Sequence, residues 1–316
     1  MKTPFPYFGA KHHVAADIWE RFGNPSYYYE PFGGSLGTLL GRPEATERQR
    51  YEYVGDAECL ITNFFRAAKL ANPEDLARLA DWPASQLDLE ARTSWLKGHR
   101  LWLSESLRAD PTWYDLECAA WFVWVESVKI NTNGTSVVLR RTTGVRRRNQ
   151  DLTEYFIALS KRLKDVTIHF GDWTKLANAA SKESSHSETG ILLDPPYKYD
   201  TGRQKELYIT DSGDVATYVH RWALARAQTN PKLKIALCGF AGEHKMPPTW
   251  EEVAWSSKLG KGRERIWFSP SCQQRAEPKT EEIQSRDSVS PEPVVLPSGD
   301  NCLPLGCRPV SVLARL

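Results

Sequence analysis

The sequence predicts an α/β fold built on a doubly wound, parallel sheet. Short apolar or aromatic segments alternate with helical patterns on either side of residues 72–164, which are mostly helical in character. Strands that alternate with helices are typical of parallel sheets covered on both faces. Three of the expected strands also end at an acidic residue, namely Glu30, Asp56 and Asp194. That edge of an open α/β sheet is where ligands bind.

The expected strands are short and rich in β-branched, aromatic and aliphatic residues. The first is the tyrosine-rich run at residues 27–29, and the fifth begins at Lys234. In chain order they cover residues 27–29, 51–54, 166–170, 190–193, 234–238, 252–255 and 266–268.

The expected helices follow from apolar residues at helical spacing and from residues that favour helix starts. Leu60, Phe64 and Ala67 fall on one face of the first, Pro73 begins the next, and Asp151 precedes another. Helices are expected over residues 60–70, from 73, over 86–107 and 116–128, from 151, and over 214–228.

This pattern predicts a discontinuous organisation of the chain. Residues 1–58 and 166–270 are expected to form one catalytic domain, and residues 59–165 a helical insert within it. Residues 271–316 are polar, contain repeated prolines and show no sustained period, so we expect a disordered tail.

Composition excludes several classes of protein. The formal net charge is only +2, so net charge alone does not indicate a polyanionic partner. Six cysteines in a chain of 316 residues do not indicate a disulfide framework. They include no C-x-x-C pair, which argues against a zinc site. No signal-peptide pattern and no run long enough to span a bilayer is evident, so we expect a cytoplasmic protein, of a bacterial or phage-infected cell, with no metal and no membrane partner.

The strongest local motif is Asp194-Pro195-Pro196-Tyr197, directly after the apolar strand at residues 190–193. Two prolines cannot continue a strand ladder, so the chain must turn away at the carboxyl end of that strand. An acidic side chain, a rigid carbonyl and an aromatic ring are thereby held in a fixed relation. A plain Asp-Pro turn would explain the first three residues but not the strand before them or the ring after them.

A second motif, residues 30–37 with the sequence EPFGGSLG, follows the tyrosine-rich strand. A glycine-rich turn after the first strand lets the backbone approach a nucleotide-like cofactor closely, although an ordinary loop can look the same. Asp56 ends the next strand, where an acidic residue binds ribose hydroxyls in nucleotide-binding folds.

Together these motifs resemble the Dam-like (D12 class) adenine-specific DNA methyltransferases, which include many phage enzymes. The resemblance begins at residues 6–11 (PYFGAK) and ends near residues 265–270 (RIWFSP), in the order the family keeps. Between them come residues 30–34, Asp56, residues 171–173 and residues 194–197. Ala10 and Leu36 stand where the family often has glycine.

The resemblance implies a Rossmann-like doubly wound methyltransferase sheet with a helical target-recognition insertion. It implies that S-adenosylmethionine binds at the amino-terminal motif, the glycine-rich turn and two strand-end aspartates. The cofactor residues so implied are Tyr7, Lys11, Glu30, Phe32, Gly34, Asp56 and Asp172. Phe32 and Gly34 would hold the methionine part, Asp56 the ribose hydroxyls and Asp172 the adenine. The catalytic residues so implied are Asp194, Pro195, Pro196 and Tyr197.

The chemistry of such a reaction fits these residue types. The N6 amine of adenine is a poor nucleophile because its lone pair is delocalised into the ring. The Asp194 carboxylate and the Pro195 carbonyl could accept its two N–H bonds and favour a pyramidal, more nucleophilic nitrogen. Methyl transfer then needs in-line positioning, without a metal or a covalent intermediate. An adenine in double-stranded DNA must be flipped out to reach the site, where Tyr197 can stack on it.

A polar segment in the expected insert contains Asn133 and five arginines, Arg140, Arg141, Arg146, Arg147 and Arg148. Such a cluster is either a solvated loop or a surface that contacts phosphates and guanine edges; its setting favours DNA. Alternatives for the whole protein are a cytosine-N4, an RNA or a protein-amide methyltransferase, or a DNA-binding protein with an inactive cofactor site. A restriction endonuclease counterpart is compatible with the resemblance.

Overall fold

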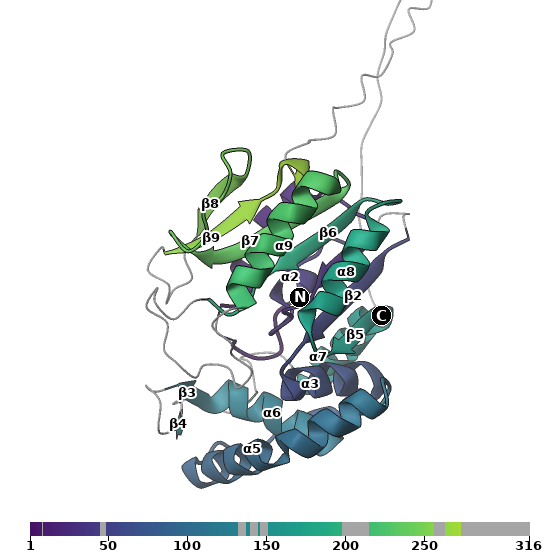
Figure 1. Cartoon of the computed structure of the whole chain (residues 1–316). Coiled ribbons are helices and arrows are strands. Elements are labelled where there is room, and N and C mark those ends of the chain that lie inside the picture. The colour runs from purple at the N-terminus through teal and green to yellow at the C-terminus, as the bar shows by residue number, and fades with distance from the viewer. Residues whose placement is uncertain are drawn as a thin grey trace, which may run out of the picture. The chain divides into compact units, whose positions relative to one another are not determined.

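A computed structural model describes the fold over residues 1–7, 9–44, 49–131, 137–139, 145, 151–197, 215–255 and 263–272. All of these residues lie in one compact unit, residues 1–275 (Figure 1). Within it, a large sheet is flanked by helices, and a helical region follows the second strand in the sequence. In the described part of the chain, no helix combines the length and the apolar character that a bilayer crossing needs.

The sheet has the order β5-β2-β1-β6-β7-β9-β8. Its strands are β1 (Tyr27–Glu30), β2 (Tyr51–Asp56), β5 (Val166–Phe170), β6 (Thr189–Leu193), β7 (Leu233–Phe240), β8 (Glu251–Trp255) and β9 (Glu264–Phe268). The first five of these strands along the chain pair in parallel and wind outward from β1 in both directions. This is the doubly wound, Rossmann-like sheet that the sequence predicts, and the strand order reverses between β1 and β6, where such sheets bind ligands.

One strand departs from the parallel arrangement expected from the sequence. β9 lies between β7 and β8 and is antiparallel to both. Only eight residues, 256–263, separate β8 from β9. A parallel pairing needs a crossover of a dozen residues or more, so this short connection favours antiparallel neighbours.

Alternate residues of the central strands are buried on opposite faces of the sheet. Ile191 and Leu193 of β6 pack with α8 (Trp173–Glu183) and α9 (Val215–Thr229), which lie together on one face (Figure 1). Leu192 belongs to the other apolar cluster, with α1 (Ala15–Phe22) and α2 (Gly37–Leu40). Burial on both faces explains why this strand is a continuous apolar run and not an alternating one.

Between β2 and β5 the chain forms α3 (Cys59–Leu70), α4 (Pro73–Ala80), α5 (Gln86–Ala109), α6 (Leu116–Val128) and α7 (Leu152–Leu163). A short hairpin of β3 (Lys129–Asn131) and β4 (Val137–Leu139) follows α6. Side chains of Asn72, Ser85, Asp115 and Asp151 cap helix starts by accepting backbone N–H bonds. α3 packs against the other helices of this region and also against the sheet, so the helical region and the sheet share one core.

The described helices also include elements that the sequence analysis did not anticipate. These are α1, α2, α8 and the 3-10 helices at Lys11–His13 and Pro270–Cys272. Ser271 and Cys272, at the start of the expected tail, are buried: the Ser271 hydroxyl donates to the Leu233 carbonyl, 2.8 Å away. Residues 273–316 lie outside the described residues.

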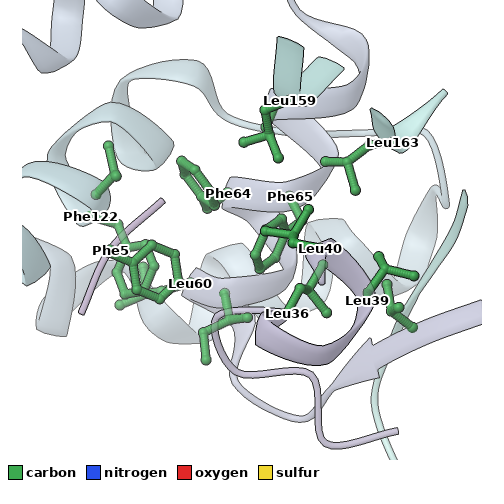
Figure 2. Packing of buried hydrophobic residues seen from close by; sticks show 14 of the residues in the cluster. Phe5, Leu36, Leu39, Leu40, Leu60, Phe64, Phe65, Phe122, Leu159 and Leu163 are labelled. Atoms are coloured by element: carbon green, nitrogen blue, oxygen red, sulfur yellow. The ribbon is translucent and has the colours of Figure 1, made fainter. Parts of the chain in front are cut away.

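The amino-terminal segment is anchored by Phe5, whose side chain is fully buried. Its ring lies 5.4 Å from that of Phe64 and 5.1 Å from that of Phe122, both in edge-to-face geometry, and 6.1 Å from that of Phe65 (Figure 2). Such aromatic pairs stabilise the fold by more than the burial of their apolar area alone would. Phe5 therefore fixes the segment that carries Tyr7 and Lys11 to helices α3 and α6.

Replacing Phe5 with alanine should lower the free energy of unfolding by about 3–5 kcal/mol, because it leaves a cavity among the rings of α3 and α6. Urea denaturation measures this loss. Phe5→Leu should lower the free energy of unfolding by less. Leu101→Ala, at a side chain that is 72% exposed, should lower it only slightly. A Phe5→Ala loss no larger than that of Leu101→Ala would contradict the anchoring role.

Candidate active site

A cavity of about 350 Å³ opens at the carboxyl ends of four adjacent strands, β5, β2, β1 and β6. Each strand contributes residues that immediately follow its last hydrogen-bonded position. The lining residues include Tyr7, Gly9, Lys11, Glu30, Phe32, Gly34, Asp56, Glu58, Arg108, Asp172, Trp173, Asp194 and Pro196. Neighbouring strands lie about 4.8 Å apart, so the distance from β5 to β6 along this edge is roughly 14 Å.

Asp56 ties the strand ends together on the floor of the cavity. Its Oδ2 accepts a 2.9 Å hydrogen bond from the Gly34 amide, and its Oδ1 accepts a 2.8 Å bond from the Glu58 amide. Its own carbonyl accepts from Gly171 at 3.1 Å, after β5. Both carboxylate oxygens retain a further lone pair for a ligand. Burial raises the pKa of Asp56 to about 7, although these backbone donors act in the opposite direction.

The glycine-rich turn has a backbone that other residues could not easily adopt. Gly34 has φ of +51°, and a Cβ there would lie 2.9 Å from the Tyr7 ring. Leu36 also lies in the left-handed region, at φ of +55°, a conformation that favours glycine. Ala10, with φ of −53°, needs no glycine.

Glu30 lies beneath this turn and is 3% exposed. Its Oε2 accepts hydrogen bonds from the Tyr28 hydroxyl at 2.9 Å and from the Leu39 amide at 3.2 Å. Burial raises the pKa of Glu30 to about 8, and these two donors only partly oppose it. Glu30 therefore supports the turn, and near neutral pH it is largely protonated.

At the β6 end, Lys11 and Asp194 form a largely buried ion pair. The Lys11 Nζ donates to Asp194 Oδ2 at 2.5 Å and to the Gly9 carbonyl at 2.7 Å. Asp194 Oδ1 accepts from the Tyr197 hydroxyl at 3.1 Å. Burial pulls the pKa of Lys11 down, but Asp194 and the other acidic groups around it outweigh burial and leave the pKa above its usual value. The lysine is thus a permanent cation against the Asp194 carboxylate.

Aromatic rings surround this ion pair. The Lys11 ammonium lies 5.6 Å from the ring centroid of Tyr197 and 5.2 Å from that of Trp255, at distances typical of cation–π contacts. Tyr197 itself packs edge-to-face on Phe240, with centroids 4.7 Å apart. Trp255 comes from β8 and was not identified from the sequence, because nothing local to it indicates that the sheet order brings it to Lys11.

Asp172 lies at the opposite, β5 end of the cavity. Its Oδ1 caps α8 by accepting from the Thr174 amide at 2.8 Å. Trp173 stacks on Phe32, with ring centroids 6.0 Å apart. The cavity thus has one end built on the Lys11–Asp194 pair and another built on Asp172, Trp173 and residues of the helical region.

The structure gathers most of the expected site residues. Tyr7, Lys11, Glu30, Phe32, Gly34, Asp56, Asp172, Asp194 and Pro196 all line the cavity. Tyr197 is adjacent through its bond to Asp194, and Pro195 is not among the lining residues. Lys11, expected as a cofactor residue, is bonded to Asp194. Asn133, Arg140, Arg141, Arg146, Arg147 and Arg148 lie outside the described residues. Among the described residues, no cluster could hold a metal ion.

No protein-family model matches this sequence, and no curated protein matches it either. Among solved structures, the chain is similar to the rRNA methyltransferase aviRa from Streptomyces viridochromogenes. That similarity has a TM-score of 0.32 and 17% sequence identity, and it covers 86% of this chain and 89% of that chain.

Glu30 should make stability depend on pH. Its folded pKa of about 8 lies above its ordinary 4.5, so the folded state holds a proton that the unfolded state has lost between these values. The free energy of unfolding should therefore fall as pH rises from about 5 to 8, by at most ~1.4 kcal/mol per pH unit from this group. Urea denaturation of Glu30→Gln between pH 6 and 9 should show a flatter profile.

Glu74→Gln, at an exposed carboxylate in the first turn of α4, is the matched control and should keep the parent slope. Parent and Glu30→Gln profiles that run parallel across this range would show that Glu30 is ionised in the folded protein.

Proposed function

We propose that this protein is an S-adenosylmethionine-dependent methyltransferase that acts on the N6 amine of adenine in DNA, as its resemblance to the Dam-like class implies. One observation carries the proposal: a single cavity joins the glycine-rich turn and Asp56 to the Asp194 carboxylate. A cofactor on this floor and an amine at Asp194 would meet within the same enclosed space.

The residues of the cavity fit this cofactor. Gly34 has no side chain between its backbone and the Tyr7 ring, so Tyr7 and the turn backbone can line the cavity together. The cavity volume of about 350 Å³ lies within the usual range of ligand pockets. Five carboxyl groups line the cavity, against two basic side chains, Lys11 and Arg108. An acidic lining suits a sulfonium, which supplies the electrophilic methyl group when the cofactor is bound. The carboxyl groups are Glu30, Asp56, Glu58, Asp172 and Asp194.

The arrangement of strands also gives the bound molecule a direction. The reacting end must lie at Asp194, on β6, where the target amine is held. The nucleoside end then extends over Asp56 towards Asp172, roughly 14 Å along the strand ends. Asp56 is in the middle, with lone pairs left for ribose hydroxyls.

Asp194 is prepared to accept a hydrogen bond from an amine. Each of its oxygens already accepts one bond, from Lys11 or from Tyr197, and each keeps a second lone pair. Lys11 and Tyr197 each hold one oxygen of this carboxylate and so fix its orientation. The amine loses one proton as it gains the methyl group, and the same carboxylate can take that proton. This group therefore stabilises positive charge as it develops on the nitrogen.

Asp194→Ala should lower the rate of adenine methylation by at least about a hundredfold, because it removes this acceptor. Cofactor affinity, measured by calorimetry, should stay within a few-fold of the parent. Asp165→Asn, at an exposed carboxylate before β5, is the control and should retain full activity.

Asp194→Ala also leaves the buried Lys11 ammonium without its carboxylate partner. The double variant Lys11→Met with Asp194→Ala removes both charges and tests the role of Asp194 without an unpaired buried charge. Full methylation by either variant would contradict the role of Asp194. Mapping modified bases on DNA distinguishes N6-methyladenine from N4-methylcytosine, which the same acceptor could also produce.

DNA binding is expected from the arginine segment. Replacing Arg146, Arg147 and Arg148 with alanine should weaken binding to duplex DNA and flatten its salt dependence, by about one unit of slope for each phosphate that is no longer neutralised. Salt titrations of parent and triple variant measure this, with cofactor affinity as a second readout that should not change. Arg78→Ala, at a largely exposed side chain of α4, is the control. Equal slopes for parent and triple variant would mean that this segment is only solvated.

A further inference from the structure

Arg108 reaches the cavity from outside the sheet. It lies in the last turn of α5, yet it lines the cavity together with Asp172 and Trp173. Its guanidinium carbon is 5.1 Å from the ring centroid of Phe170, the last residue of β5. The helical region therefore contributes a wall to the β5 end of the cavity.

The end of α5 is held rigidly in this position. Arg66 of α3 donates from Nη1 to the carbonyls of Leu107 and Asp110, at 3.1 and 2.9 Å, on either side of Arg108. Further back on α5, Arg100 forms an ion pair with Glu58, which follows β2. Arg108 thus projects from a fixed backbone, as a residue that binds a ligand with specificity should.

Arg108 is the basic group of the cavity that has no carboxylate partner among the described residues. Lys11 is paired with Asp194, whereas no carboxylate of the described residues lies within 4 Å of the Arg108 guanidinium. Asp172 presents the complementary group, since its Oδ1 caps α8 and its Oδ2 makes no hydrogen bond to the part of the chain that the structure describes. Within the described part of the chain, one end of the cavity therefore offers guanidinium donors and a carboxylate acceptor that have no protein partner and are not bonded to each other.

We infer that Arg108 binds the adenine ring of the cofactor, donating to its ring nitrogens while Asp172 accepts from its 6-amino group. This rests on the proposed function. An adenine presents an amine donor beside a ring acceptor, and a carboxylate with a guanidinium matches that pair. Hypoxanthine, the base of inosine, has a carbonyl acceptor at position 6 and an N–H donor at position 1, so its donor and acceptor are exchanged relative to adenine. Arg108 and Asp172 together thus select adenosine over inosine.

The test measures binding of three adenosine ligands by calorimetry: S-adenosylmethionine, S-adenosylhomocysteine and 5′-methylthioadenosine, which lacks the amino-acid part. Arg108→Ala should weaken all three by a similar factor, about tenfold to a hundredfold, as expected for charge-assisted hydrogen bonds. Arg108→Gln, which keeps much of the side-chain length, should also bind them more weakly. Lys97→Ala, at an exposed cation on the same helix, should bind all three as the parent does.

S-inosylhomocysteine adds a readout that a structural role would not change. The parent should prefer S-adenosylhomocysteine to the inosine analogue, and Arg108→Ala should narrow that preference. If Arg108→Ala weakened binding of S-adenosylmethionine and S-adenosylhomocysteine but not of 5′-methylthioadenosine, the inference would be overturned. Arg108 would then bind the carboxylate of the cofactor's amino-acid part. Unchanged affinity for all three ligands, with weaker DNA binding, would overturn it in favour of a phosphate contact. A parent protein that binds none of the three would overturn the proposed function, and this inference with it.

Discussion

The buried ion pair between Lys11 and Asp194 is the interaction on which the site depends. A buried charge that loses its partner costs several kcal/mol, so each of these groups requires the other to be in place. Asp194 is placed by β6 and its prolines, whereas Lys11 arrives on an amino-terminal segment far away in sequence. Phe5 anchors that segment in the aromatic core of α3 and α6. The packing of Phe5 against α3 and α6 thereby determines where the Lys11 ammonium lies in the cavity.

Around this pair, the cavity concentrates acidic groups that burial keeps partly protonated. The pKa of Glu30 rises to about 8 and that of Asp56 to about 7, because neither is well solvated. A cationic ligand would favour their ionised forms, since opposite charge lowers a carboxyl pKa. Binding of a sulfonium should therefore release protons, and partial protonation spares the protein the full repulsion of five ionised carboxylates. The same groups that lower stability at higher pH prepare the site for a cation.

The helical region supports the cavity through α3 and lines part of it through α5. α3 is part of the common core, and its first turn follows directly from Asp56 through Glu58. α5 adds Arg108 at the β5 end, so the region proposed to recognise DNA also touches the proposed adenine site. A ligand that binds both surfaces stabilises their relative position, so cofactor and DNA affinities should influence each other reciprocally.

Local patterns in the sequence were sufficient to predict the strands, most helices and the acidic strand ends. The Asp194-Pro195-Pro196-Tyr197 turn is set by its two prolines within a few residues, so the sequence alone determines it. The left-handed conformation of Leu36 is one that its residue type does not favour, so the tertiary structure decides it. The antiparallel insertion of β9 was not predicted, because strand pairing depends on partners distant in the chain. Nor could local patterns place Trp255 against Lys11, or Arg108 at the same end of the cavity as Asp172. Those residues are far apart in the sequence, and only the packing of the sheet and α5 decides that they meet.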